Sequence, residues 1–318
     1  MLSNVYSKSY LQSSPTMAAV TKAVIYDRFL PALQLEVKAS TPFNIYTIFS
    51  AATMDFVTGY LFGLQSSSNW LQDEGHRSKI LELYNSRKGY VFWPQEMPGL
   101  TFFLERIGVR TVPRRVNDAN KEIEDWVLDM CDGAKEFLAQ SKGNSADKLP
   151  PEEAANFPVV FSQLESGMGK SISKGEIAYS PERQRLEIAS EVLDHLAAGF
   201  DTSGITLTYL IHEMSRRADL QASLRKELLT LNPPVSLHSI SANGSPALPS
   251  PKSFEVLPLL NAIMDETLRL RAAIPGPEPR ITPPWRMYSR AKRRVPEYPR
   301  RREDFCIRPL SPSKSRSI

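Results

Sequence analysis

Residues 180–217, SPERQRLEIASEVLDHLAAGFDTSGITLTYLIHEMSRR, decide the fold of this chain. They open with Ser180, Pro181 and Glu182, which is typical of a helix start, because Ser caps a helix and Pro suits its first position. The pattern after them predicts a helix of more than thirty residues. Because such a length is unusual in a globular protein, we expect a spine that crosses the molecule.

The centre of this helix, AAGFDT, contains residues that helices usually avoid. Gly199 costs up to about 1 kcal/mol relative to alanine, and Asp201 and Thr202 compete for backbone hydrogen bonds. Taken alone, the five residues AGFDT, 198–202, favour a simple interpretation: a glycine tolerated in a core helix beside a surface aspartate. The alternative is a notch beside a flat ligand, with a hydroxyl and a carboxylate that relay protons.

The rest of the first 284 residues also reads as helices, separated by loops rich in Pro, Gly and Ser. The apolar segment 42–64 contains one charge and predicts a buried core helix rather than a membrane span. Almost no strand alternation is present, so the predicted fold class is mainly α with little sheet. The expected helices cover residues 14–40, 42–64, 69–89, 116–140, 152–167, 180–217, 218–231 and 253–274.

The net charge of +4 is unevenly distributed. Residues 285–318 hold eleven Lys and Arg against three Asp and Glu, so this tail carries +8 and the first 284 residues carry −4. The tail is rich in Arg, Pro and Ser and shows no periodicity, which predicts disorder or a change of reading frame. The two cysteines exclude a disulfide framework, and no Cys/His spacing suits zinc.

The sequence DETLRL, 265–270, places Glu266 and Arg269 on one face of the last predicted helix. One interpretation is an exposed pair worth a few tenths of a kcal/mol. The other is a buried, bidentate carboxylate–guanidinium pair. The many leucines around the two residues favour burial.

These two motifs, in this order, resemble the cytochrome P450 family. The helix with AGFDT is similar to the family's oxygen-binding helix, and the DETLRL helix to its Glu-x-x-Arg helix. RAAIPGPEPRITPP, 271–284, resembles the Pro-rich run of fungal-type microsomal members, and SAATMDFVTGYLFG, 50–63, resembles a buried helix upstream. The resemblance covers residues 1–284 and implies an incomplete, P450-like helical domain.

The resemblance implies roles for the central helix. Gly199 would leave room for dioxygen over a heme, with Ala198 beside it as a second cofactor-binding position. Thr202 would hydrogen-bond the oxygen or a nearby water, and Asp201 would help to deliver protons, so these two would be the catalytic residues.

Three further positions have implied roles. Glu266 and Arg269 would form a structural pair that supports the heme side of the core. Arg280, in PEPRITP, would provide a cation for a heme propionate.

The sequence departs from the family at both ends. The loop Phe-x-x-Gly-x-x-x-Cys-x-Gly, whose thiolate binds the heme iron, is absent, and Cys306 in DFCIRPL lacks its glycines. Cys131 is predicted to be a buried helix residue. The N-terminal anchor, the first sheet and the Trp-x-x-x-Arg helix are also missing. We therefore expect no metal ligand and an internal piece of a P450, or the product of a mis-spliced or mispredicted gene.

Three functions stay open. By resemblance, the chain derives from a heme-thiolate mono-oxygenase of the endoplasmic reticulum membrane, which oxidises a small organic substrate with electrons from NADPH–cytochrome P450 reductase. The second is a non-catalytic helical fragment, cytoplasmic or of unknown location without its anchor and inactive without its cysteine loop. The third is a binding module that uses the basic tail, although no nucleic-acid motif is present.

Two further features have two interpretations each. FWPQEMPGLTFF, 92–103, is apolar, aromatic and irregular, so it lines a substrate entrance or forms a packed loop. Among the scattered histidines, His195 lies one turn before AGFDT; a satisfied core histidine is favoured over one that faces a pocket.

Overall fold

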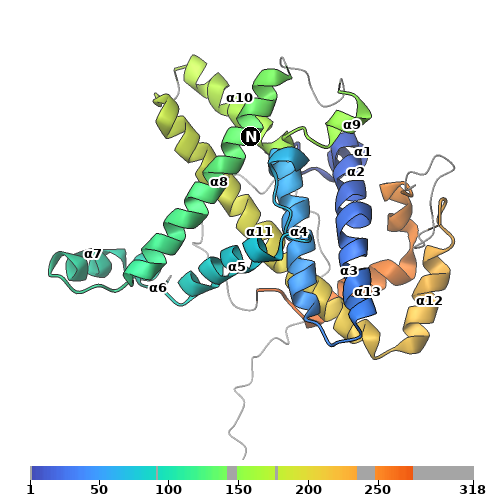
Figure 1. The fold of residues 1–318 in the computed structure, drawn as a ribbon. Coiled ribbons are helices and arrows are strands. Elements are labelled where there is room, and N and C mark those ends of the chain that lie inside the picture. The colour runs from blue at the N-terminus through green and yellow to red at the C-terminus, as the bar shows by residue number, and fades with distance from the viewer. Residues whose placement is uncertain (1, 91, 142–148, 176–177, 235–247, 275–318) are drawn as a thin grey trace, which may run out of the picture. The chain divides into compact units, whose positions relative to one another are not determined.

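The computed structural model describes residues 2–90, 92–141, 149–175, 178–234 and 248–274. Within these ranges the chain is helical and has no strand, which confirms the mainly α fold (Figure 1). The described residues belong to one compact unit, Met1–Ile274. The predicted boundary at residue 284 and the basic tail lie outside them.

The helices follow one another with short connections. The first half of the described chain contains α1 (Lys8–Ser13), α2 (Pro15–Lys22), the π-helix η1 (Ala23–Phe29), α3 (Leu30–Ala39), α4 (Ile45–Phe62), the 3₁₀ turn η2 (Leu64–Ser66), α5 (Glu74–Lys88), α6 (Phe92–Glu96) and α7 (Pro98–Arg106). The second half contains α8 (Arg114–Gln140), α9 (Pro151–Ala154), α10 (Val159–Ser173), α11 (Pro181–Ser215), α12 (Ala218–Leu228), η4 (Pro251–Val256) and α13 (Pro258–Leu270).

Helix α4 is the buried apolar helix expected at 42–64. Asn44 caps its start by accepting the backbone N–H of Tyr46 at 3.1 Å, and 13 of its 18 residues are buried. The helix ends at Gly63, whose φ is 80° and where a side chain would lie 2.0 Å from the carbonyl oxygen of Asn156. Among the described helices, none combines the length and apolarity that a membrane crossing needs.

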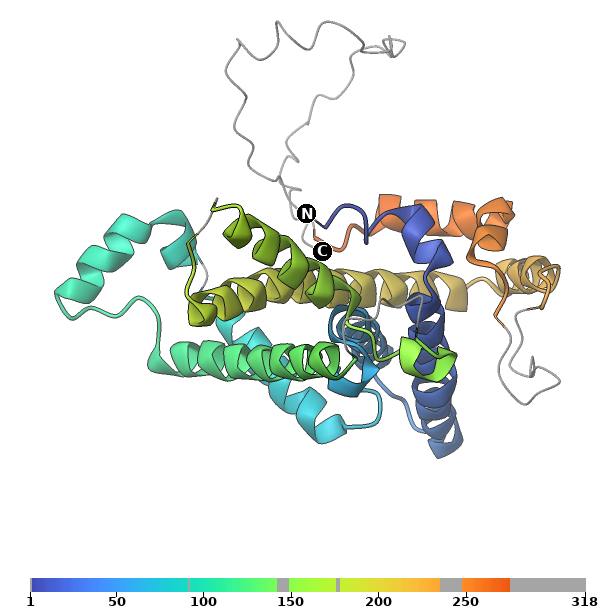
Figure 2. The same cartoon turned by 90° about the horizontal axis from the view of Figure 1, so that it is seen from above.

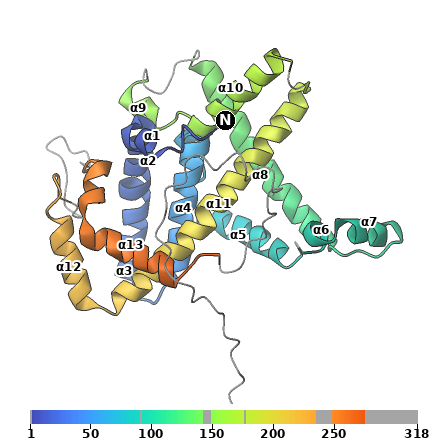
Figure 3. The ribbon, with the colours of Figure 1, turned by 180° about the vertical axis from the view of Figure 1, so that it is seen from behind.

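Helix α11 is the long helix predicted from the opening stretch. It contains 35 residues and starts as expected, with Pro181 at its first position and the Ser180 hydroxyl accepting the N–H of Arg183 at 3.2 Å. Helix α4 crosses it and forms the most extensive helix pair of the described residues (Figure 3). Helices α8 and α10 also pack against it (Figure 2).

Small residues allow α4 and α11 to approach each other closely. A methyl group on Gly199 would lie 2.6 Å from a Cγ atom of Val57, and one on Gly204 would lie 3.0 Å from the Ser50 hydroxyl. Both distances are shorter than ordinary van der Waals contact, so these positions favour glycine for packing. The contact with α4 therefore accounts for a glycine at position 199.

A buried carboxylate fixes the loop that follows α4. Asp55 is fully buried and accepts hydrogen bonds from the Ser68 hydroxyl at 2.7 Å and from the N–H groups of Trp70 and Leu71 at 2.8 and 3.2 Å. Arg28, from η1, lies 3.4 Å away. Burial raises the pKa of Asp55, and the bond from Ser68 opposes that shift. The single charge of the apolar helix therefore ties three segments together.

Three predicted boundaries were wrong, and proline explains each. The segment 14–40 is not one regular helix: it widens into η1 just before Pro31, where the wider turn relieves the clash of the proline ring with the preceding turn. The helix expected at 152–167 is split into α9 and α10 at Pro158. The irregular segment expected at 92–100 is helical, because Pro98 begins α7 instead of breaking a helix.

Candidate functional site

One side of the α11 centre, called the open side here, is not covered by other described residues. Positions 198, 202, 205 and 209 share a helix face, and none of them is buried. Ala198 is exposed, and the Thr202 hydroxyl donates to the Ala198 carbonyl at 2.7 Å. Such a bond to the preceding turn loosens the backbone ladder locally. The open side therefore presents a small residue and a hydroxyl at adjacent turns.

Gly199 does not belong to the open side. Its missing side chain accommodates Val57 of α4, so the contacts of the described residues give it a packing role. The expectation that Gly199 also leaves room beside a cofactor remains a prediction.

Asp201 lies on a third side of the helix, between α4 and α5. Its carboxylate accepts a hydrogen bond from the Tyr46 hydroxyl at 3.0 Å and one from the Lys88 ammonium at 3.1 Å. The side chain is 20% exposed. Asp201 is therefore a half-buried carboxylate fixed by two hydrogen bonds. It is not the unpaired surface aspartate that the AGFDT motif alone favoured.

Aromatic rings support this carboxylate. Tyr84 of α5 packs edge-on against Phe200, with ring centroids 5.2 Å apart, and the Lys88 ammonium lies 4.8 Å from the Tyr84 ring centroid. Burial raises the pKa of Tyr46, the Ser50 hydroxyl lowers it, and the negative charge of Asp201 raises it further. Tyr46 is therefore a protonated donor at neutral pH.

Sequence reasoning missed Tyr46 and Lys88. Tyr46 lies 155 residues before Asp201, and Lys88 lies 113 residues before it. Neither residue belongs to a motif, and only the crossing of α4, α5 and α11 brings them to Asp201. The only sequence signal was the pattern that predicted the three helices.

The pair Glu266–Arg269 forms, but it is not buried. Arg269 donates two hydrogen bonds to the Glu266 carboxylate, at 2.7 and 2.6 Å. The side chains are 52% and 66% exposed within the described residues. The expectation of burial from the neighbouring leucines was therefore wrong: Leu268 and Leu270 are themselves about half exposed.

The histidines do not converge. His195 is half-buried, stacks on Tyr6 with ring centroids 5.2 Å apart and lies 3.6 Å from Glu191, so it has partners, as expected. His76 belongs to α5, His212 lies in the last turn of α11, about 17 residues after His195, and His238 lies outside the described residues.

The described residues offer no thiolate to the open side of α11. Cys131 is 2% exposed within α8, as predicted, and burial raises the pKa of its thiol to about 12. No group of three His, Cys, Asp or Glu side chains in the described ranges could hold a metal ion. Cys306 and Arg280 lie outside those ranges.

Known proteins are similar to this chain in sequence. The profile of the family described as "Cytochrome P450" matches residues 9–283. The cytochrome P450 monooxygenase avaI of Aspergillus versicolor is 24% identical over 283 residues, which are 89% of this chain and 55% of the relative. Cytochrome P450 3A7 of Homo sapiens is 26% identical over 241 residues, or 75% of this chain and 41% of the relative.

A third relative agrees with the first two. The cytochrome P450 monooxygenase phqM of Penicillium fellutanum is 24% identical over 273 residues, 81% of this chain and 44% of the relative. The chain spans about half the length of the curated relatives it matches. Because the family profile matches most of the chain, the chain belongs to the cytochrome P450 family.

Proposed function

We propose that this chain provides the α11 wall of a heme-dependent mono-oxygenase site. The observation that carries the proposal is the open side of α11, where an exposed Ala198 and a half-buried Thr202 lie at adjacent turns of the longest described helix. Heme is the cofactor of the family to which the chain belongs. When bound, it supplies the chemistry that activates dioxygen and inserts one oxygen atom into an organic substrate.

The residues of the open side suit one face of a flat ring. Ala198 is small enough for a ring to approach the helix backbone, and the Thr202 hydroxyl lies one turn further along the same face. The nearest described thiol, Cys131, is buried in another helix. The described residues would therefore lie beside a bound heme, and a thiolate for its iron would have to come from outside the described ranges.

Thr202 and Asp201 would each take part in proton transfer at the site. The Thr202 hydroxyl now donates to the Ala198 carbonyl and can rotate to donate into the open side instead. The Asp201 carboxylate can hold a proton at the outer end of this proton path. Hydrogen bonds from Tyr46 and Lys88 fix the position of the carboxylate. The roles of both residues follow from these contacts together with the family resemblance.

The site also implies partners. As a P450, the chain would act on a small organic substrate and receive electrons from a reductase that uses NADPH. Glu266 and Arg269 would be structural, and Arg280 would face a heme propionate. The substrate itself stays open.

A membrane location would suit the short helices α6 and α7. Together with the residues just after them they expose many large apolar side chains: Phe92, Trp93, Met97, Leu100, Phe102, Phe103, Ile107 and Val109. Arg106, Arg110 and Arg114 follow in the chain and could meet anionic lipids. We expect the chain to cosediment with anionic vesicles and to lose this binding when Phe102 and Phe103 are replaced by Asp; unchanged cosedimentation would contradict the proposal.

The second candidate is a helical fragment without catalysis. Its supporting observation is that the described residues offer no thiolate to the open side of α11. The two candidates differ in what they predict for the ligation of heme.

The deciding experiment titrates heme into the purified chain and follows its Soret absorbance. We expect saturable binding that weakens at least tenfold in Ala198→Trp. The matched control is Ser203→Trp, which adds the same bulk at an exposed position of the same helix and should bind like the parent chain. Equal losses in both variants would contradict a heme at the open side.

A reduced, carbon-monoxide difference spectrum of the loaded chain then separates the candidates. A thiolate-type Soret band would support the mono-oxygenase, and Cys131→Ser and Cys306→Ser would show which cysteine binds iron. Its absence would support the fragment.

A further inference from the structure

A line of aromatic side chains connects the AGFDT motif with α8. Phe200 of the motif meets Trp70, in the loop after α4, edge-on, with ring centroids 6.0 Å apart. Trp70 stacks on Trp126 of α8, with ring centroids 5.8 Å apart and an angle of 17° between the ring planes. His76 of α5 meets Trp126 edge-on, at 5.7 Å. The four rings therefore form one continuous series of contacts.

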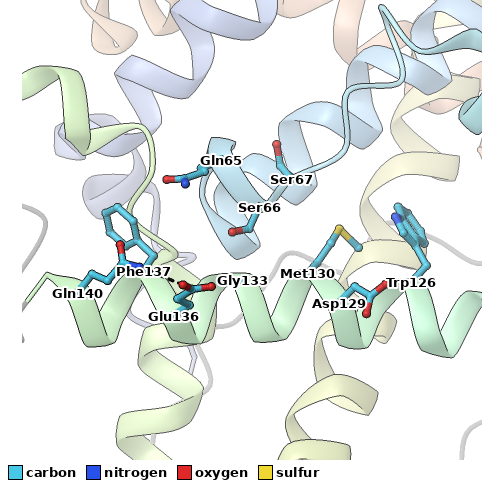
Figure 4. A pocket seen from close by; sticks show the side chains of 10 residues that line it. All are labelled: Gln65, Ser66, Ser67, Trp126, Asp129, Met130, Gly133, Glu136, Phe137 and Gln140. Carbon is cyan, nitrogen blue, oxygen red and sulfur yellow. Dashed lines mark hydrogen bonds between the residues drawn. The ribbon is translucent and has the colours of Figure 1, made fainter.

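The burial of these rings decreases along the line. Phe200 is 1% exposed and Trp70 is fully buried. Trp126 is half-buried and lines a groove between η2 and one face of α8 (Figure 4). The two tryptophans therefore connect the interior beside α11 with the outside of α8.

The indole N–H of Trp70 has no hydrogen-bond partner among the described residues. A buried donor without a partner is uncommon and needs an explanation. Tryptophan is one of the side chains that lose an electron most easily, and its radical cation becomes a weaker oxidant once the indole proton has left. Because neither solvent nor a protein acceptor reaches the N–H of Trp70, an oxidised Trp70 would keep its proton and take an electron from the next ring.

Trp126 has the opposite surroundings. The carboxylate of Asp129 lies beside its ring in the lining of the groove (Figure 4), and a negative charge at this distance stabilises a positive charge on the ring. The half-buried position also gives the indole proton a way to solvent. We therefore expect a missing electron to be more stable on Trp126 than on Trp70, which gives the line a direction from the interior to the surface.

From these contacts we infer that Trp70 and Trp126 form a path that carries oxidising equivalents from the α11 centre to the surface. The inference rests on the proposed heme site, where oxygen chemistry without substrate would generate a one-electron oxidant. Trp70 gives one electron to that oxidant, and Trp126 then gives one electron to Trp70. Oxidised Trp126 releases its indole proton to water, and a small-molecule reductant such as a thiol or ascorbate returns one electron and one proton. The path protects the site from its own oxidant.

The test creates the oxidant at the α11 centre of the full chain without heme, so its outcome does not depend on heme binding. Ala198→Cys is labelled with a ruthenium polypyridyl photosensitiser in a Cys306→Ala background. Cys131 stays unlabelled, because it is buried and the pKa of its thiol is raised to about 12. A laser flash with a soluble electron acceptor turns the label into a one-electron oxidant. Transient absorption then distinguishes the tryptophan radical cation from the neutral radical.

We expect the labelled parent chain to form a neutral tryptophan radical. Trp126→Phe should leave only the radical cation of Trp70, which takes its electron back from the label. Trp70→Phe should lower the radical yield at least tenfold. The matched control is Trp93→Phe, which removes an exposed indole ring from α6 and should leave the yield unchanged.

Circular dichroism should show the same helix content in all variants, and Trp126→Phe carries the test if Trp70→Phe does not fold. The inference is overturned if Trp126→Phe forms the neutral radical in the same yield as the parent chain, since the electron would then come from another residue. It is also overturned if a folded Trp70→Phe keeps the full yield, if Trp93→Phe abolishes the radical, or if the parent chain forms no tryptophan radical.

Discussion

The two sides of the α11 centre differ sharply. The side facing α4 buries Phe200 and Gly204 and accepts a hydrogen bond from Thr53 through the Phe200 carbonyl at 3.0 Å. The open side, with Ala198 and Thr202, has no comparable cover among the described residues. The seven positions 198–204 therefore combine two environments: one set of residues packs against α4, and the neighbouring set is left uncovered.

The largest effect is expected on the packed side. Phe200→Ala removes a ring that is 1% exposed and packs against Trp70 and Tyr84. The cavity should lower the free energy of unfolding by about 3–5 kcal/mol. Urea denaturation measures this change. Tyr209→Ala, on the open side, should cost less than about 1 kcal/mol, and similar costs for the two variants would contradict the division of the helix into two sides.

Gly199→Ala tests whether the glycine serves packing. Helix propensity alone predicts stabilisation by up to about 1 kcal/mol. The clash with Val57 instead predicts destabilisation of about 1–3 kcal/mol. The same denaturation measurement gives the sign. Adding Val57→Ala should recover part of the loss, because it removes the atoms that the new methyl group meets.

A stabilisation in Gly199→Ala would refute the packing role. In that case the glycine would be free to serve a ligand, as the family resemblance implies.

Tyr46 donates a hydrogen bond to Asp201, which lies between the two sides of α11. Tyr46→Phe keeps the ring and removes the donor to Asp201, so we expect a loss of about 1 kcal/mol of unfolding free energy. A double-mutant cycle with Asp201→Asn measures the coupling. Additive effects would show that the 3.0 Å contact carries no energy.

Stability at alkaline pH tests the Tyr46–Asp201 contact through the ionisation of Tyr46. The pKa of Tyr46 is raised in the folded protein, first by burial and then by Asp201. Its contribution to stability is therefore complete below the unfolded pKa of about 10 and is lost as the pH rises through the folded value. Asp201→Asn removes a negative charge and should lower the pKa of Tyr46. NMR titration of ¹³Cζ-labelled tyrosine measures this; an unchanged or higher pKa would contradict it.

The smallest stability effect is expected on the open side. Thr202→Val keeps the shape and removes a hydroxyl that bonds only to the preceding turn, so the free energy of unfolding should change by less than about 0.5 kcal/mol. Thermal denaturation gives the value. A loss as large as that of Gly199→Ala would mean that Thr202 holds the fold and is not free for chemistry.

The sequence alone predicted the parts of the fold that local chemistry controls. Ser180 and Pro181 mark the start of α11, and the apolar run of α4 marks a buried helix, because capping and burial depend on residues close in the chain. The proline-dependent boundaries were missed because Pro98 can begin a helix as well as break one. The match of AGFDT to a family pattern located the candidate site.

The partners in the site were not predictable in the same way. Tyr46 and Lys88 meet Asp201 only because three helices cross, and no local pattern encodes that crossing. The exposure of Glu266 and Arg269 was also missed, since the composition around a residue does not fix which elements cover it.

The crossing of α4 and α11 has a consequence for how the chain folds. The two helices are separated by more than a hundred residues of sequence, so their contact closes a long loop and should form after the local pairs. At ribosomal speeds of about 5–20 residues per second, α4 waits roughly 6–30 s for its partner to be synthesised. During that interval its apolar face has no partner in α11, and we expect it to be exposed to chaperones and to aggregation.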